Sequence, residues 1–527
     1  MRRLSRVNRC CVAILLAIAA PAVCLAAGPS MPAIFSDHMV LQREKPIPIW
    51  GRAEANENVT VTLAKGKETP VAKAGTQADA SGKWMVRLPA LSAGGPYTLQ
   101  IKAKKAFKFE NVMLGEVWVC SGQSNMYWVV SRSKDADKEI AAANYPDIRL
   151  FSVNLRTAPM PTEEVNGGPW QTCTPETIKD FSAVAYFFGR ELHGELKVPI
   201  GLIKTAWGGT AIEPWTPPVG FASVPSTQRY FDQVQEADRD YIKSLADHLD
   251  KRAEWAHAAG QVKLDEGDKL PPAPMLPEHT FANGGNRMPT VIYNAMVDAM
   301  VPYAIAGAIW YQGENNCSRG DGLAYADKMK ALIQGWRAMW DQGEFPFYYV
   351  QLAPFKYTLH NPAIRTDQMP LIWQAQLNAL AIPNTGMAVT TDVGDWRDIH
   401  PADKLTVGRR LALWALTRTY GRDDVVCSGP LYRSLAIEDG KVRVTFDHVG
   451  GGLMARDGQP LNWFEVAAAD GEFVAARAEI DGDVVVVWSD DVPEPAAVRY
   501  AWHMLPEPIP NLVNKAGLPA SPFSTRP

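Results

Sequence analysis

The chain has 527 residues, of which 47% are apolar and 21% are charged, with 53 basic and 57 acidic side chains. At roughly 150 residues per domain, this length predicts about three domains with several buried cores. The balanced charge excludes a disordered polyelectrolyte, and without a basic excess nothing supports nucleic-acid binding.

The first 27 residues have the pattern of a secretory signal peptide. An apolar run from Cys11 to Ala20 follows a basic head, and small residues continue to Ala27; the head contains Arg2, Arg3, Arg6 and Arg9. The alternative, a membrane anchor, needs about 20 continuous apolar residues, and Pro21 breaks this run. We therefore expect export to the periplasm or the cell exterior, with no membrane span.

Beyond this segment only four cysteines remain: Cys120, Cys173, Cys317 and Cys427. They are too sparse for a disulfide framework, and none has the C-x-x-C spacing of a zinc or redox site. One or two bridges and buried free thiols are both consistent with the sequence. The chain also contains no HExxH, P-loop or G-x-G-x-x-G segment, so we expect neither a metal nor an organic cofactor.

Two β-rich regions flank a central region in which strands and helices alternate. Residues 28–110 alternate with period two, as at Val59, Val61 and Leu63, which predicts an N-terminal β domain. Residues 111–420 contain short apolar runs at 117–119, 200–203, 306–310 and 347–352, separated by helical stretches. Such runs are typical of a parallel sheet covered on both faces, so we expect a three-layer α/β/α central domain. Residues 421–527 return to period two and predict a C-terminal β domain, and both flanking domains are expected to be sandwich-like.

The central region includes a helical insertion at about residues 222–280. Residues 228–259 are charged and have helical spacing, and a proline-rich segment at 271–277 ends the pattern. The insertion is either a solvated helix or a lid or wall of a substrate cleft, and the sequence leaves both interpretations open.

Ser124 is the candidate nucleophile. It lies in a small polar turn that follows the apolar run 117–119, and ligands of open α/β sheets bind beyond the carboxyl ends of the strands. Met126 stands where a G-x-S-x-G elbow would have its second glycine, which argues against an ordinary α/β-hydrolase.

His400 is the candidate base. It lies in a loop before a helix expected at 405–416, and Asp398, two residues earlier, could hold the tautomer of the imidazole. Asp395 is a second carboxylate in the same loop. The alternative is a surface histidine at the start of a helix.

Two further loops could supply hydrogen-bond donors to a developing oxyanion. Gly208 and Gly209 follow the run 200–203, and Gln312 follows the run 306–310. Free backbone N–H groups and an amide side chain suit this role. Paired glycines also end strands for purely steric reasons.

These motifs, in their order along the chain, resemble those of the sialate O-acetylesterase family, the GQSNM-type carbohydrate esterases of the SGNH hydrolase superfamily. The similar segments are 122–126, 207–210, 310–315 and 398–401. Segments 35–42 and 511–519 are also similar to that family, so the resemblance covers nearly the whole chain after the signal peptide.

The resemblance implies an SGNH-hydrolase central domain, with Ser124 as nucleophile, His400 as general base and then acid, and Asp398 as the orienting carboxylate. Many SGNH hydrolases have the acid three residues before the histidine, where this chain has Arg397. Asp395 or a main-chain carbonyl could therefore orient His400 instead.

The resemblance also implies an oxyanion hole. Its donors would be the Ser124 backbone N–H, a backbone N–H at Gly208 or Gly209, and the Gln312 side chain. For the neighbouring Glu314 we expect a structural role. The tryptophans near the motifs could stack on a sugar or belong to the core, and they are Trp118, Trp128, Trp207, Trp215 and Trp310.

The function implied is a secreted esterase that hydrolyses O-acetyl esters of sialic acids through a Ser-His-Asp acyl-enzyme mechanism. Its partner would be an O-acetylated sugar or glycan. The motifs indicate hydrolysis of an ester but do not identify the sugar that carries it. Acetylated xylan or another plant polysaccharide is therefore the alternative substrate. A third possibility is a carbohydrate-binding protein without catalysis.

Overall fold

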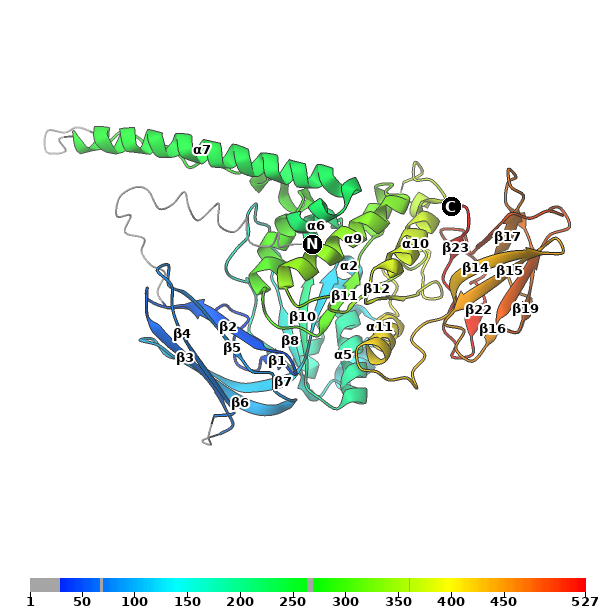
Figure 1. Cartoon of the computed structure of the whole chain (residues 1–527), viewed down its shortest axis with the longest axis horizontal. Helices are drawn as coiled ribbons and strands as arrows, with labels where there is room; N and C mark the ends of the chain where they lie inside the picture. Colours follow the sequence, from blue (N-terminus) through cyan, green and yellow to red (C-terminus); the bar gives the residue numbers. More distant parts are fainter. Residues whose placement is uncertain (1–28, 67–69, 263–268, 360) are drawn as a thin grey trace.

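The computed structural model describes residues 29–66, 70–262, 269–359 and 361–527. The expected signal peptide, residues 1–27, lies outside the described residues. A large, mostly parallel sheet occupies the centre of the molecule, and further β-sheets lie at both ends (Figure 1). The prediction of a mixed α/β fold with additional β regions is confirmed.

Most strands of the N-terminal region pair antiparallel, and the first one pairs in parallel with residues 113–115. The strands are β1 (Val40–Gln42), β2 (Ile47–Arg52), β3 (Asn58–Ala64), β4 (Ala72–Gln77), β5 (Lys83–Leu88) and β6 (Gly94–Lys102). Strand β2 pairs with β5, and β3 pairs with both β4 and β6. Val59, Val61 and Leu63 are buried while Thr60 and Thr62 are partly exposed, because successive side chains of a strand point to opposite faces.

The long strand β7 (Phe107–Gly122) joins this region to the central sheet. Its first part pairs antiparallel with β6, and its last part pairs in parallel with the two neighbouring strands of the central sheet. The strand is therefore continuous across residues 110 and 111, where the sequence analysis divides two domains. That division remains a prediction.

The central sheet has the strand order β13-β12-β11-β7-β10-β8-β9. Its other strands are β8 (Tyr145–Ser152), β9 (Gln171–Cys173), β10 (Ile200–Ala206), β11 (Gly307–Tyr311), β12 (Phe347–Val350) and β13 (Thr385–Ala388). All neighbours in this order are parallel except the edge strand β9, which is antiparallel to β8. Every residue of β10, β11 and β12 is buried, as the continuous apolar runs predict.

Helices cover both faces of this sheet (Figure 1). Helices α5 (Ala183–Leu196) and α11 (Lys404–Arg418) lie on one side, and α9 (Tyr325–Trp340) and α10 (Gln368–Asn378) lie on the other. Successive side chains of strand β12 point to opposite faces of the sheet and contact helices on both sides. Phe347 contacts Trp336 of α9, and the next residue, Tyr348, contacts Trp414 of α11.

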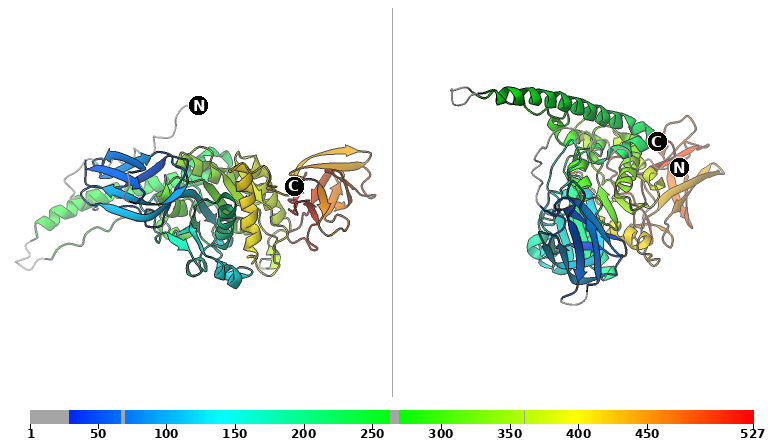
Figure 2. Two further views of the ribbon diagram at one scale, coloured as in Figure 1. Left: turned by 90° about the horizontal axis from the view of Figure 1, so that it is seen from below. Right: turned by 60° about the vertical axis from the view of Figure 1, so that its left-hand side comes forward.

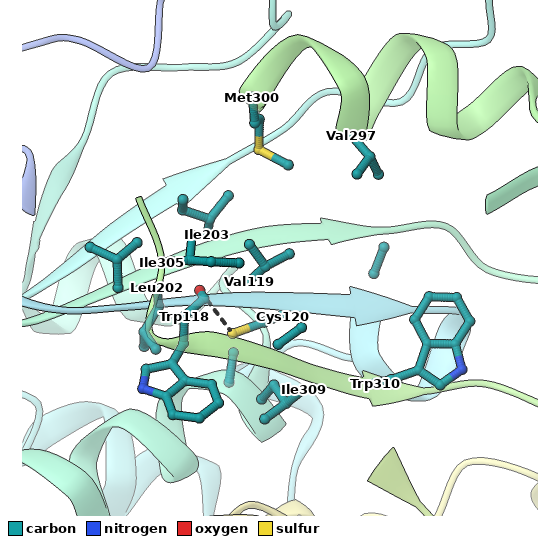
Figure 3. Packing of buried hydrophobic residues seen from close by; sticks show 14 of the residues in the cluster. Trp118, Val119, Cys120, Leu202, Ile203, Val297, Met300, Ile305, Ile309 and Trp310 are labelled. Atoms are coloured by element: carbon teal, nitrogen blue, oxygen red, sulfur yellow. Dashed lines mark hydrogen bonds between the residues drawn. The ribbon is translucent and has the colours of Figure 1, made fainter. Parts of the chain in front are cut away.

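The core also includes the irregular segment before β11, which consists of η6 (Tyr293–Val297) and η7 (Asp298–Met300). Val297 and Met300 of this segment point toward Val119 and Ile203 of the sheet (Figure 3). All four side chains are fully buried or nearly so. The segment thus closes part of one face of the sheet.

The expected helical insertion forms a long arm. Helix α6 (Pro218–Ser223) is followed by α7 (Gln228–Gly260), a helix of 33 residues that extends beyond the rest of the molecule (Figures 1 and 2). Only Val234, Ala237 and His248 of α7 are buried. The predicted charged helix is confirmed, whereas its role as a lid or wall remains a prediction.

The C-terminal region has its own hydrophobic core and two four-stranded sheets. One contains β14 (Leu431–Glu438), β15 (Lys441–Asp447), β20 (Val484–Trp488) and β19 (Arg477–Asp481), and the other contains β18 (Val474–Ala475), β17 (Phe464–Ala467), β21 (Ala497–Tyr500) and β23 (Phe523–Ser524). A small pair joins β16 (Leu453–Ala455) to β22 (Leu512–Asn514). The end of the chain contacts the central region, where Gln351 Nε2 donates to Ser521 Oγ at 2.8 Å.

The four cysteines are buried free thiols and not disulfide bridges, as one of the two interpretations of the sequence expected. They are Cys120, Cys173, Cys317 and Cys427. Across the described ranges, no helix is both long and apolar enough to cross a bilayer.

Candidate active site

Ser124 lies where β7 ends at the carboxyl edge of the central sheet. Gly122 has φ +140°, and a Cβ there would lie 2.1 Å from the carbonyl oxygen of Tyr311. Only glycine therefore allows the backbones of strands β7 and β11 to approach this closely. Gln123 N then donates to the same carbonyl at 2.9 Å. Ser124 begins the short helix α2 (Ser124–Tyr127) and is partly exposed. The local backbone thus presents the serine at the edge where ligands bind.

His400 contacts both Ser124 and Asp398. Its Nε2 lies 2.8 Å from Ser124 Oγ, and its Nδ1 lies 2.8 Å from Asp398 Oδ1. The His400 backbone N–H donates to the same carboxylate oxygen at 2.9 Å. Asp395 instead accepts the backbone N–H of Arg397 at 2.8 Å, and within the described residues no hydrogen bond joins it to His400. A continuous Ser-His-Asp chain of hydrogen bonds therefore includes Asp398 and not Asp395.

The surroundings of His400 favour its neutral form. Burial lowers the pKa of His400, the Asp398 carboxylate opposes this change, and the cations Lys404 and Arg132 add to the lowering. The ring also stacks on Trp128, with centroids 4.9 Å apart. Asp398 has a pKa below its usual value, because its hydrogen bonds from His400 outweigh the opposing effect of its partial burial. A neutral imidazole beside an ionised carboxylate can accept the serine proton.

Free backbone donors surround Ser124. A Cβ on Gly208 would lie 3.3 Å from Ser124 Cβ, so this loop is in close contact with the serine. Gly209 has φ +72°, a left-handed conformation that favours glycine. Among the described residues, no acceptor is paired with the backbone N–H of Ser124, Gly208 or Gly209. These three groups are available to a ligand.

Gln312, predicted as a side-chain donor, is fully buried and holds the surrounding loops together. Its Nε2 contacts Gln123 Oε1 at 3.2 Å, the Thr210 carbonyl at 3.1 Å and Asn316 Oδ1 at 2.7 Å. Both amide hydrogens therefore have acceptors within the protein.

Asn315, which the sequence analysis did not select, is partly exposed. It donates one hydrogen bond from Nδ2 to the Gly209 carbonyl at 2.8 Å. Because an amide nitrogen carries two hydrogens, Asn315 retains one for another acceptor. In the sequence, the only indication that Asn315 could be a donor was its position three residues after Gln312.

A buried network connects the serine turn to the histidine loop. Asn125 Nδ2 donates to Glu314 Oε1 and, at 3.1 Å, to the carbonyl of Ile399, while Asn125 Oδ1 accepts from Lys404 Nζ. Lys404 is 0% exposed and Glu314 is 4% exposed. Burial lowers the pKa of Lys404 to about 7 and raises the pKa of Glu314. The residue after Ser124 is thus hydrogen-bonded to the residue before His400, and Glu314 has the structural contact expected of it.

The tryptophans near the motifs separate into two groups. Trp118, Trp215 and Trp310 are buried in the core, whereas Trp128 and Trp207 are partly exposed near Ser124. In the part of the chain that the structure describes, no cluster of three His, Cys, Asp or Glu side chains could hold a metal ion.

Comparisons with known proteins agree with this fold. Residues 114–246 and 279–416 match the family described as carbohydrate esterase, sialic acid-specific acetylesterase. The chain is 32% identical over 437 residues to the sialate O-acetylesterase of Rattus norvegicus, covering 76% of this chain and 75% of the relative. It is 31% identical over 425 residues to the human sialate O-acetylesterase, covering 75% of this chain and 72% of the relative.

A solved structure is also similar over almost the whole chain. A carbohydrate acetylesterase from Xanthomonas citri has 34% sequence identity and a TM-score of 0.78, and the match covers 94% of this chain and 99% of that one. The protein is therefore an esterase of the carbohydrate esterase class. It belongs to the sialic acid-specific acetylesterase family.

Proposed function

We propose that this protein hydrolyses O-acetyl esters of sialic acids with Ser124 as the nucleophile, as a member of the SGNH hydrolase superfamily. The observation that carries the proposal is the hydrogen-bonded chain from Ser124 Oγ through His400 to Asp398. The relatives named sialate O-acetylesterase support the choice of substrate.

In this mechanism His400 Nε2 accepts the proton of Ser124 as Oγ attacks the acetyl carbonyl. Asp398 holds the Nδ1 proton and stabilises the imidazolium that forms. His400 then protonates the departing sugar hydroxyl, which leaves an acetyl group on Ser124. Water hydrolyses this ester by the same route, and acetate is released.

The oxyanion is proposed to accept hydrogen bonds from the backbone N–H of Ser124 and of Gly208 or Gly209. The third donor was expected to be Gln312. For Gln312 to donate, one of its existing contacts would have to break, whereas Asn315 has an uncommitted amide hydrogen beside Gly209. We therefore propose Asn315 as the third donor and Gln312 as the residue that holds its loop.

Acetyl esters of a neutral polysaccharide such as xylan are the second candidate substrate. The likeness to the carbohydrate acetylesterase from Xanthomonas citri supports deacetylation of a carbohydrate and is compatible with this candidate. Residues 1–27 are proposed to direct export, on the evidence of their basic head and apolar run.

The test is acetate release from O-acetylated sialic acid and from acetylated xylan in parallel. We expect release from the sialic acid, and we expect Ser124→Ala to lower kcat by a factor on the order of 10⁴ to 10⁶ with the fold intact. Circular dichroism of the variant controls for folding. Preferential release from xylan would make acetylated xylan the substrate in place of acetylated sialic acid. Full activity of S124A would refute the role of Ser124 as nucleophile.

A further inference from the structure

Arg132 lies in a short turn beside the proposed catalytic residues. The turn η1 (Val130–Arg132) follows α2, and its backbone is fixed to the segment before α5. Val130 N donates to the Phe181 carbonyl at 3.1 Å, and Ser131 N donates to the Lys179 carbonyl at 3.0 Å. The position of Arg132 is therefore set by the fold rather than by a free loop.

The guanidinium of Arg132 is held against Trp128. Its Cζ lies 4.1 Å from the centroid of the Trp128 ring, and the indole Nε1 donates to the Arg132 carbonyl at 2.9 Å. Trp128 in turn stacks on the His400 ring at an interplanar angle of 17°. The Trp128 ring thus contacts both the Arg132 guanidinium and the His400 ring, and this packing holds the cation near the proposed base.

Arg132 has no acidic partner. Its side chain is exposed, and within the described ranges no carboxylate lies at ion-pair distance from it. By contrast, Arg410 is paired with Asp392, and Arg190 is paired with Glu139. Asp398 instead accepts two hydrogen bonds from His400 on its Oδ1. A fixed, exposed and unpaired guanidinium is suited to an anionic ligand.

We propose that Arg132 binds the carboxylate of an acidic acetylated sugar and thereby selects sialic acids over neutral glycans. The guanidinium that lies over Trp128 can bind a carboxylate through two parallel hydrogen bonds. A neutral xylan offers no such anion. This inference deepens the proposed function and depends on it for the identity of the sugar.

The arrangement also connects substrate binding with the base. Arg132 is one of the cations that lower the pKa of His400. A carboxylate bound to Arg132 would offset its charge and make the imidazole a stronger base when the acidic sugar is present. A neutral substrate would not have this effect.

Two variants test the selectivity. Arg132→Gln replaces the guanidinium with a planar, uncharged amide, and Arg132→Lys keeps the charge without the bidentate edge. For O-acetylated N-acetylneuraminic acid we expect KM to rise about tenfold or more in R132Q, with partial recovery in R132K. For 4-nitrophenyl acetate, kcat/KM should change less than about threefold, because loss of one exposed charge leaves the Ser-His-Asp chain in place.

A matched control is available on the arm. Arg252 also lies over a tryptophan, 5.9 Å from the ring of Trp255, but belongs to α7. Arg252→Gln should leave KM for both substrates unchanged. Equal losses on the acidic and neutral substrates in R132Q, or no loss on either, would overturn the inference.

Inhibition separates this inference from the proposed function. Free N-acetylneuraminic acid and its uncharged methyl ester are compared as inhibitors of 4-nitrophenyl acetate hydrolysis. We expect the acid to inhibit more strongly in the wild type and equally to the ester in R132Q. If the wild type shows this pattern but releases no acetate from O-acetylated sialic acid, the proposed substrate is wrong and the carboxylate site stands. If the wild type hydrolyses that substrate and the acid has no advantage, the carboxylate site is wrong and the function stands.

Discussion

At the scale of single residues, the proposed chemistry depends on the hydrogen bonds that join Ser124 Oγ to His400 and His400 to Asp398. Ser124 and His400 are 276 positions apart, yet the sequence near each one indicates a functional role. Ser124 lies in a polar turn after an apolar strand, and His400 has a carboxylate two residues before it. The sequence could not decide whether Asp398 or Asp395 orients His400, since that choice depends on the direction in which each side chain points. The different contacts of Gln312 and Asn315 could not be predicted either, because their partners come from loops that are distant in sequence.

Asp398→Asn tests the orienting role at the scale of one residue. An amide can still bond His400, but it would favour the wrong tautomer, so we expect kcat to fall by roughly 10⁴ with little change in KM. Asp395→Asn is the control, since Asp395 only accepts the Arg397 N–H, and it should cost less than about threefold. Steady-state kinetics with 4-nitrophenyl acetate measure both variants. A loss below about tenfold in D398N would assign the orientation of His400 to another group.

At the scale of elements, three helix starts meet at one buried network. Asn125 is in α2, Glu314 begins α8 (Glu314–Ser318) and Lys404 begins α11. A lysine at the first position of a helix is opposed by the helix dipole and is expected to be exposed. Its complete burial depends on Asn125 and on the Trp128 and Tyr311 rings, over which Nζ lies at 5.7 and 5.5 Å. For this reason the helix could be predicted from the sequence but the burial of Lys404 could not.

Lys404→Met tests the protonation of this network. Burial lowers the pKa of Lys404 from 10.5 to about 7, so between these values the unfolded chain binds a proton that the folded chain has released. The free energy of unfolding should therefore rise with pH in this window, by at most about 1.4 kcal/mol per pH unit, and K404M should lack this contribution. Urea unfolding of both proteins at several pH values from about 7.5 to 9.5 measures the difference.

Lys328 provides the control for this prediction. It is also a buried lysine, but its ion pairs with Glu213 and Asp321 raise its pKa despite the opposing effect of burial. Lys328→Met should lower stability by a similar amount throughout the same pH window. Identical pH slopes in the wild type and K404M would contradict a deprotonated Lys404 in the folded protein.

At the scale of the whole molecule, the change of pattern near residue 110 is real but lies inside one strand. The burial of β7 alternates up to Asn111 and is continuous from Val112 to Gly122. Periodicity detects this change of surroundings, whereas the continuity of the strand depends on pairing with β6, β10 and β11. The family match likewise omits residues 247–278, of which 247–260 form the last part of α7. The unmatched segment therefore includes only the last part of α7, and it lies outside the segments that hold Ser124, His400 and Asp398.

The most direct test of the account is to locate the acetyl group during turnover. The enzyme is mixed with 4-nitrophenyl acetate or O-acetylated sialic acid, quenched in acid within the first turnover, and digested for mass spectrometry. We predict an acetyl group on Ser124 with both substrates and none in S124A, because the Ser-His-Asp chain activates this hydroxyl. An acetyl group on another residue, or continued turnover by S124A, would contradict the central claim.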